Sequence, residues 1–232
     1  FDTTGDLVWG HWFGSNSADA IYGLDVDAAN NIYITGVAGT KNRVASGGNW
    51  QTNLALPPIV VHGIAHRDIV TAKFDPAGTT QWVTIYGGGT QKLAGIDVAV
   101  TGDSVYSVGY FNWTVDFDPS ADDNLASRYA DRRTDPFLVR HNAADGSFMC
   151  VATITSNKNS VANGVDVDAA GKVYVAGYFN NFADFDPSAD TGRFSSLGRS
   201  DGFVARYNPD CSLDDTDVAV ALTPPSFTVA GT

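Results

Sequence analysis

The stretch Val161-Ala-Asn-Gly-Val-Asp-Val-Asp-Ala-Ala-Gly-Lys-Val-Tyr-Val-Ala-Gly177 decides the fold, because the chain carries it in three versions. The other two begin at Ala20 and Leu93, and the shared Gly-x-Asp cores recur about every 70 residues. Two alternating apolar runs separated by a short turn with Gly or Asn predict a β-hairpin. In the third copy we expect these strands at 164–168 and 173–178.

A second pattern recurs after each hairpin and begins at Asp68, Asp135 and Asp201. It predicts a third strand, such as 203–207, and a turn that leads to a fourth strand, such as 148–153. Four-stranded units repeated head to tail are typical of propeller blades. The sequence therefore predicts an all-β fold, a β-propeller-like array of about three four-stranded blades, with units near 20–86, 93–154 and 161–210.

The composition agrees with this fold class. All 26 acidic residues of the 232-residue chain are Asp, and Gln occurs only at positions 51, 81 and 91. Helices draw on Glu, Gln and Leu, whereas Asp and Gly gather in turns and aromatic residues in strands. With 24 Gly, 13 Phe, 9 Tyr and 5 Trp, the chain has the composition of an all-β protein.

The charge excludes two classes of partner. With 14 basic residues against 26 acidic ones, the formal net charge is −12. Phosphate backbones and anionic lipids repel such a surface, so we expect no nucleic acid and no basic membrane patch. No apolar run approaches the roughly 20 residues of a transmembrane helix, so we expect no membrane insertion. Divalent cations are attractive partners.

The N-terminal segment is a partial fourth copy. Residues Phe1–Gly5 align with Phe74–Gly78, which places Trp9 on Trp82. The partial copy covers residues 1–13, and within it we expect an opening strand from Asp6 to Phe13. Closed propellers hold roughly four to eight blades, so about three units do not easily form a standard ring. We expect the opening strand to complete the last unit, either within one chain or between chains, because pairing removes an open sheet edge.

These residues resemble a known family. The Ala162–Gly177 segment, the two Asp-Phe-Asp-Pro-Ser segments and the Asp-x-Phe-Val-x-basic-aromatic strand are similar to the bacterial β-propeller repeat of secreted and cell-surface proteins. The resemblance covers residues 1–210, which we take as the repeat domain, and implies a multi-bladed propeller in an extracellular or cell-surface location. It implies little about activity.

The remaining residues, 211–232, predict an extended tail. From Asp217 onward they resemble the opening strand of immunoglobulin-like repeat domains of bacterial surface proteins. Two interpretations stand side by side. The chain is cut from a larger surface protein, or the tail is a strand donated to a neighbouring subunit.

The duplicated Asp-Phe-Asp-Pro-Ser-Ala-Asp segment is the best candidate metal site. Oxygen side chains at alternate positions suit a hard cation that takes six to eight oxygen ligands, so we expect Ca2+. The alternative is a turn in which Asp caps backbone N–H groups. The predicted ligands are Asp116, Asp118, Ser120, Asp122, Asp184, Asp186, Ser188 and Asp190.

Cys150 and Cys211 permit one disulfide, which would suit an oxidising compartment; two buried thiols are the alternative.

We also expect the long insertions 38–67, 111–134 and 179–200 to gather on one face of the molecule. There Trp50, Trp113 and Phe182 are candidates for stacking on a polysaccharide or protein ligand, or else for packing the insertions against the scaffold.

Catalysis finds little support. The usual hydrolase, zinc-protease and phosphate-loop motifs do not occur, and Glu, the usual proton donor of glycosidases, is absent. The Asp residues that recur once per unit, such as Asp27 and Asp168, are most simply structural. Asn112-Trp-Thr114 matches a glycosylation sequon.

We therefore expect a non-enzymatic structural or adhesive module, a calcium-stabilised subunit of a surface filament or array that self-associates through its terminal strands. The alternative is a carbohydrate- or protein-binding propeller domain of a larger surface protein.

Overall fold

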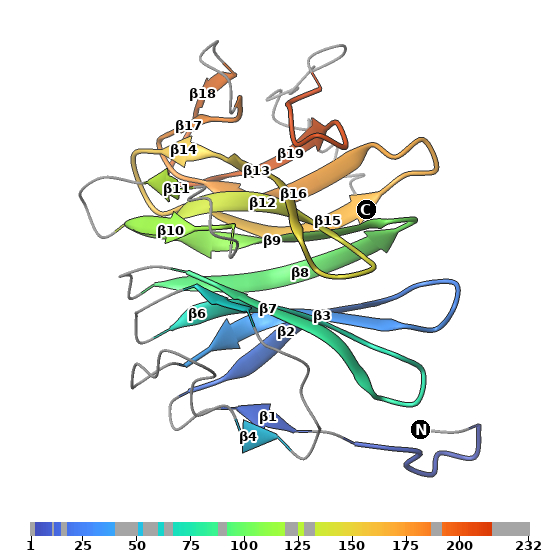
Figure 1. The fold of residues 1–232 in the computed structure, drawn as a ribbon. Coiled ribbons are helices and arrows are strands. Elements are labelled where there is room, and N and C mark those ends of the chain that lie inside the picture. The colour runs from blue at the N-terminus through green and yellow to red at the C-terminus, as the bar shows by residue number, and fades with distance from the viewer. Residues whose placement is uncertain are drawn as a thin grey trace, which may run out of the picture.

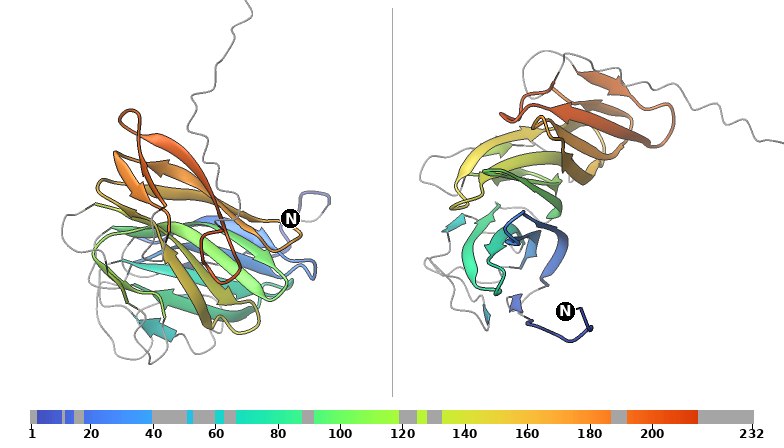
Figure 2. Two further views of the ribbon diagram at one scale, coloured as in Figure 1. Left: turned by 90° about the horizontal axis from the view of Figure 1, so that it is seen from above. Right: turned by 90° about the vertical axis from the view of Figure 1, so that its right-hand side faces the viewer.

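The computed structural model describes residues 3–10, 12–14, 18–39, 51–52, 60–62, 67–87, 92–118, 125–127, 133–186 and 192–214. Within these ranges the chain is all-β and contains no helix, as the sequence predicts. Three main sheets follow one another along the chain and stack face to face (Figure 1). Their strands are antiparallel except that Val60–His62 pairs in parallel with Thr80–Tyr86. Viewed along the strands, the three sheets succeed one another on an arc (Figure 2).

We call these the first, second and third sheets. The first has the strand order β2-β3-β6-β7-β5, the second β8-β9-β12-β13, and the third β15-β16-β19. Their strands are β2 (Ala20–Val26), β3 (Ile32–Ala38), β5 (Val60–His62), β6 (Asp68–Phe74), β7 (Thr80–Tyr86), β8 (Leu93–Thr101), β9 (Ser104–Phe111), β12 (Asp135–Asn142), β13 (Phe148–Thr153), β15 (Val161–Val167), β16 (Val173–Phe179) and β19 (Asp201–Tyr207).

Short strands make up the rest. The pairs β1 (Phe13–Gly14) with β4 (Gln51–Thr52) and β10 (Thr114–Asp116) with β11 (Leu125–Ser127) form two-stranded sheets. A small three-stranded sheet has the order β14-β17-β18, with bounds Thr155–Ser156, Phe182–Asp184 and Arg193–Ser195. Strands β10, β17 and β18 lie at the end of the main sheets opposite the hairpin turns (Figure 1).

Each first strand carries a bulge that a glycine on the second strand accommodates. The register of β2 and β3 shifts between Ile21 and Gly23, and β8 and β15 shift at equivalent places. A Cβ built on Gly36 would lie 2.0 Å from the carbonyl oxygen of Ala20, and Gly109 and Gly177 face the same obstacle. Only glycine therefore fits at the end of the repeated hairpin motif.

The cores lie between the sheets. One buried cluster joins the first and second sheets and includes Ile69, Leu93 and Phe137, and a larger one joins the second and third sheets. Strand β8 packs on β2 and β3, and β15 packs on β8 and β9, so first strands of successive sheets lie side by side. Because sheets are apolar on both faces, each one needs a neighbour on either side.

One expectation about the strands differs from the structure. Between Asp6 and Phe13 the described residues pair only at Phe13, in β1, because an extended segment becomes a strand only where a partner offers backbone groups. In the third sheet the described part of the chain supplies three full strands, followed by a bridge from Tyr207 to Leu213. This agrees with the expectation that another strand completes the last unit.

His141 is buried in the second sheet beside Tyr86 of the first, with ring centroids 5.2 Å apart. Within the described residues neither of its ring nitrogens has a hydrogen-bond partner. Burial lowers the pKa of His141 from 6.5 to about 4, and the charge of Asp118 opposes this only in part. The imidazole is therefore neutral in the folded protein at neutral pH.

We predict that His141 makes the fold acid-sensitive. Because its pKa is lower in the folded than in the unfolded chain, its contribution is complete above pH 6.5 and is lost as the pH falls towards 4, by roughly 3 kcal/mol in total. Denaturant unfolding between pH 7 and 4 should show this loss in the parent chain but not in His141→Phe. Phe is chosen because Phe74 occupies the position in the first sheet that His141 occupies in the second. Equal pH slopes for both chains would contradict the prediction.

Candidate functional site

The described parts of the two Asp-Phe-Asp loops form turns. The carboxylate of Asp116, the last residue of β10, accepts a hydrogen bond from the backbone N–H of Asp118 at 3.1 Å. Asp184 accepts one from Asp186 N–H at 3.2 Å and also pairs with the Arg193 guanidinium at 3.1 Å. This is the turn-capping geometry that the sequence left open as the alternative to a cation site.

The aromatic residue between the two aspartates is a core residue. Phe117 is fully buried between the first and second sheets, 5.1 Å from the ring of Phe137. Phe185 is buried between the second and third sheets, 4.9 Å from the ring of Phe203, and Tyr207 donates a hydrogen bond to its carbonyl. Each loop therefore inserts its Phe side chain into the core between two neighbouring sheets. The sequence pattern did not predict this packing role.

The predicted metal ligands Ser120, Asp122, Ser188 and Asp190 lie outside the described residues, and so does Trp50 of the predicted ligand face. Among the residues that the structure describes, no three His, Cys or Asp side chains are grouped so that they could hold a metal ion.

The other two aromatic candidates lie on equivalent insertions of neighbouring units. Trp113 precedes β10, is 46% exposed and has a φ of 63°. Phe182 begins β17 and is half-buried, with the Arg193 guanidinium 5.7 Å from its ring centroid. Asn112 of the sequon is buried and accepts a hydrogen bond from Lys92 N–H, so it is not accessible for glycosylation.

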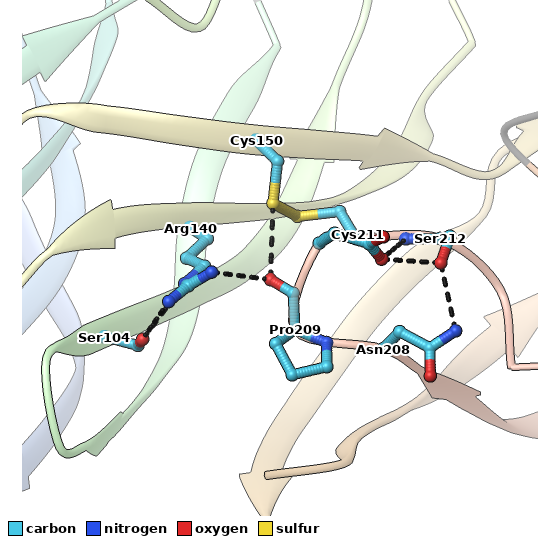
Figure 3. The surroundings of a disulfide bond; sticks show 8 residues. Ser104, Arg140, Cys150, Asn208, Pro209, Cys211 and Ser212 are labelled. Carbon is cyan, nitrogen blue, oxygen red and sulfur yellow. Dashed lines mark hydrogen bonds between the residues drawn. A yellow bond between two sulfur atoms is a disulfide. The ribbon is translucent and has the colours of Figure 1, made fainter.

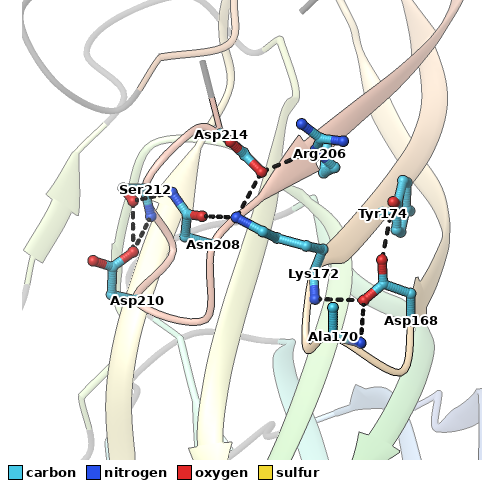
Figure 4. A network of polar contacts seen from close by, with 9 residues as sticks. All are labelled: Asp168, Ala170, Lys172, Tyr174, Arg206, Asn208, Asp210, Ser212 and Asp214. Carbon is cyan, nitrogen blue, oxygen red and sulfur yellow. Dashed lines mark hydrogen bonds and ion pairs between the residues drawn. The ribbon is translucent and has the colours of Figure 1, made fainter. Parts of the chain in front are cut away.

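The aspartates that recur once per unit accept hydrogen bonds from the chain's own turns, which is the structural role that the sequence predicts. Asp168 accepts hydrogen bonds from Ala170 N–H, Lys172 N–H and the Tyr174 hydroxyl (Figure 4). These bonds, foremost the one from Lys172 N–H, lower the pKa of Asp168. Asp27 caps the first hairpin in the same way. These carboxylates are structural groups.

A second set of aspartates joins one sheet to the next. Asp25 on β2 accepts a hydrogen bond from Val100 N–H on β8 at 2.7 Å. Asp97, the aspartate of the same Gly-x-Asp motif on β8, accepts one from Val165 N–H on β15 at 3.0 Å. Each first strand thus binds the first strand of the following sheet through one carboxylate.

A contact from the third and fourth strands, which we call a hook, completes the first junction. Lys73 at the end of β6 and Trp82 on β7 both donate to the carbonyl of Ala143, in the turn between β12 and β13, at 2.9 and 3.2 Å. Thr84 donates to the carbonyl of Gly146 in the same turn. The third and fourth strands of the first sheet therefore fasten onto the turn of the second.

The second junction repeats this geometry with different side chains. Arg140, equivalent to Lys73, donates to the carbonyl of Pro209 at 3.0 Å (Figure 3). Cys150, equivalent to Trp82, forms a disulfide with Cys211 in the turn that follows β19. Cys211 has a φ of 64°, matching the positive φ of Gly146 in the first junction's turn.

Two ion pairs fix the segment that follows β19 to the third sheet. Asp214, 1% exposed at its side chain, pairs with Lys172 at 2.8 Å and with Arg206 at 2.9 Å (Figure 4). Its N–H also donates to the carbonyl of Arg206. The chain thus stays packed on the third sheet as far as residue 214, beyond the expected start of the tail at 211.

The N-terminal segment contacts the first sheet in the same manner as a fourth strand contacts the next sheet. The Trp9 indole donates to the carbonyl of Pro76 at 3.2 Å, and Pro76 is equivalent to Ala143 and Pro209. The alignment of Trp9 with Trp82 does not by itself predict that both indoles bind a turn carbonyl. The recurring basic residue of the third-strand motif was the available signal for the hooks.

No protein-family model and no curated protein matches this sequence. The described part of the structure contains no helix long and apolar enough to cross a membrane.

We predict that the disulfide stabilises the third sheet selectively. In Cys150→Ala/Cys211→Gly the Gly keeps the positive φ while the cross-link over 61 residues is lost, so stability should fall by roughly 4 kcal/mol. Hydrogen exchange should accelerate in β15, β16 and β19 more than in β3 and β6. Met149→Ala, on the same strand as Cys150, is the control. Uniform acceleration across all sheets would contradict the selective role.

Proposed function

We propose that this chain is a non-enzymatic structural module of propeller type, which works by joining sheets into a larger assembly outside the cell. The single observation that carries the proposal is the repeated junction. Lys73 and Trp82 bind one turn carbonyl, Arg140 and Cys150 fasten onto the equivalent turn, and Trp9 binds the third member of the set.

The use of the polar groups supports a structural role. In a catalytic carboxylate pair, at least one oxygen faces substrate in a cleft. Here the recurring carboxylates of Asp27, Asp97 and Asp168 accept hydrogen bonds from the chain's own backbone. These groups are committed to turns and junctions.

The disulfide supports an extracellular or cell-surface location. Cys150 and Cys211 belong to different sheets and are joined across a junction. Such bonds persist in oxidising compartments and are rare where thiols are kept reduced.

The N-terminal segment supports self-association. Leu7 and Val8 are 65% and 64% exposed, and Trp9 holds the segment in the place of a fourth strand. A fourth strand belongs beside a third one, and apolar edges of this kind pair with other chains.

We predict that the 24.5 kDa chain self-associates. Light scattering after size separation, over about 5 to 200 µM, should give a mass above that of one copy, increasing with concentration as mass action requires. A single-copy mass across the whole range would contradict the assembly role.

We further propose that calcium binds the first Asp-Phe-Asp loop, through the carboxylates of Asp116 and Asp118. Ca2+ should raise the melting temperature by a few degrees, and EDTA should reverse the increase. Asp118→Asn should abolish the effect, whereas Asp145→Asn, in a turn of the second sheet, should retain it. A melting temperature indifferent to Ca2+ would exclude calcium binding.

A further inference from the structure

The outer face of the third sheet is built like a junction face. In the first and second sheets, the equivalents of Val204 are Thr71 and Leu138, which the next sheet buries to 0% and 2% exposure. Val204 itself is 63% exposed, and Tyr178 on the adjacent strand is 37% exposed. The third sheet therefore presents an apolar face of the kind that elsewhere in this chain carries a further sheet.

The opposite end of the array presents the matching element. Junctions are made by the first strand of the following sheet, β8 on the first sheet and β15 on the second. Leu24 on β2 is equivalent in register to Val98 and Val165, which pack against the preceding sheet. Leu24 is 62% exposed and its neighbour Val26 is 44% exposed. We call Leu24 and Val26, with Tyr22, the β2 strip.

The rest of the outer face of the first sheet is already buried. Ile34, Val70 and Ile85, on β3, β6 and β7, are 0–5% exposed. The β2 strip is thus the open part of that face, and it belongs to the strand position that makes the junctions elsewhere.

The series of aspartates that join one sheet to the next also extends to the third sheet. Asp25 and Asp97 reach forward to a backbone N–H of the next first strand, and Asp166 is the third member of the series. Within the described residues, its one hydrogen-bond donor is its neighbour Val167 N–H. Asp25 binds its own neighbour, Val26 N–H, with one oxygen in the same way and uses the other oxygen for Val100 N–H of the next first strand.

We infer that a second copy of this chain docks head to tail, with the β2 strip of one copy on the outer face of the third sheet of the other. This inference rests on the proposed function and names its partner. The contact continues an interface that the chain makes twice internally, between the first and second and between the second and third sheets. Complementary apolar surfaces at opposite ends make a heterologous contact.

The number of sheets sets the size of the assembly. Heterologous contacts form closed rings when the rotation between copies closes, and closed propellers hold roughly four to eight blades. One copy supplies three main sheets, so two copies supply six, whereas one or three copies fall outside that range. The arc of sheets in Figure 2 is consistent with half of such a ring. The assembly is therefore a two-copy ring with two identical junctions.

The N-terminal segment fits the same arrangement. Trp9 holds residues 6–10 on the Pro76 turn, where a fourth strand of a preceding sheet belongs. In the two-copy ring the preceding sheet is the partner's third sheet, whose described part has three full strands. The segment then lies along the outer edge of that sheet beyond the Leu213 bridge.

The test uses one charge on each surface of the full chain. Leu24→Asp disrupts the β2 strip and Val204→Asp disrupts the face of the third sheet. Both sites are exposed, so folding should persist, which circular dichroism and thermal melting verify. Leu197→Asp is the matched control, because Leu197 is 73% exposed outside both surfaces. Light scattering at about 50 µM should give two copies for the parent and the control, and one copy for each variant.

Mixing the two variants distinguishes the head-to-tail contact from a two-fold one. Leu24→Asp retains an intact third-sheet face and Val204→Asp retains an intact β2 strip, so an equimolar mixture should regain a two-copy mass through one good junction. A mixture that stays monomeric, or a single variant that alone keeps the parent mass, would overturn the inference. Self-association that neither variant affects would overturn it while leaving the proposed function standing; a parent chain that never associates would remove both.

Discussion

The covering of each sheet by the next is the constraint on which the rest of this structure depends. The β3 and β12 strands bury apolar side chains on both faces, so a single sheet would leave one core open to water. Stacking solves this only if neighbouring sheets keep one register. The hooks from Lys73 and Arg140 onto turn carbonyls, together with the carboxylates of Asp25 and Asp97, fix that register.

The same constraint accounts for an acidic composition made of Asp alone. The carboxylate of Asp27 or Asp168 reaches N–H groups two and four residues ahead, which closes the turn. The carboxylate of Asp97 crosses to a backbone N–H of a sheet in direct contact. Both tasks need a carboxylate one methylene from the backbone, because the Asp side chain is short enough to mimic a backbone turn. A longer Glu would overshoot these donors and lose more rotamer freedom.

Sequence patterning predicted the regular part of the fold well. Strands at Phe148–Thr153 and within Asp201–Tyr207 were foreseen because alternation and turn residues are local signals. The opening strand predicted at Asp6 to Phe13 is instead found only as the short pairing of Phe13–Gly14, since pairing depends on a partner outside the local sequence. Phe117 escaped notice because its burial depends on how two sheets stack, and the aspartates around it suggest a cation loop. The pairing of Cys150 with Cys211 stayed open for the same reason, as it spans a junction.

The outer face of the third sheet is not polar, as the outer face of a terminal unit would be. Terminal units of stacked repeats keep a polar outer face, because nothing covers them. The third sheet instead places Val204 on its outer face, at a position where the inner sheets bury Thr71 and Leu138, and Tyr178 is partly exposed beside it. At one corner of this sheet Lys172 and Arg206 both pair with Asp214. Leu24 and Val26 are exposed at the far end of the chain. Both ends of the array therefore carry the apolar chemistry of an interior junction, which is the chemistry of a unit that continues into another sheet.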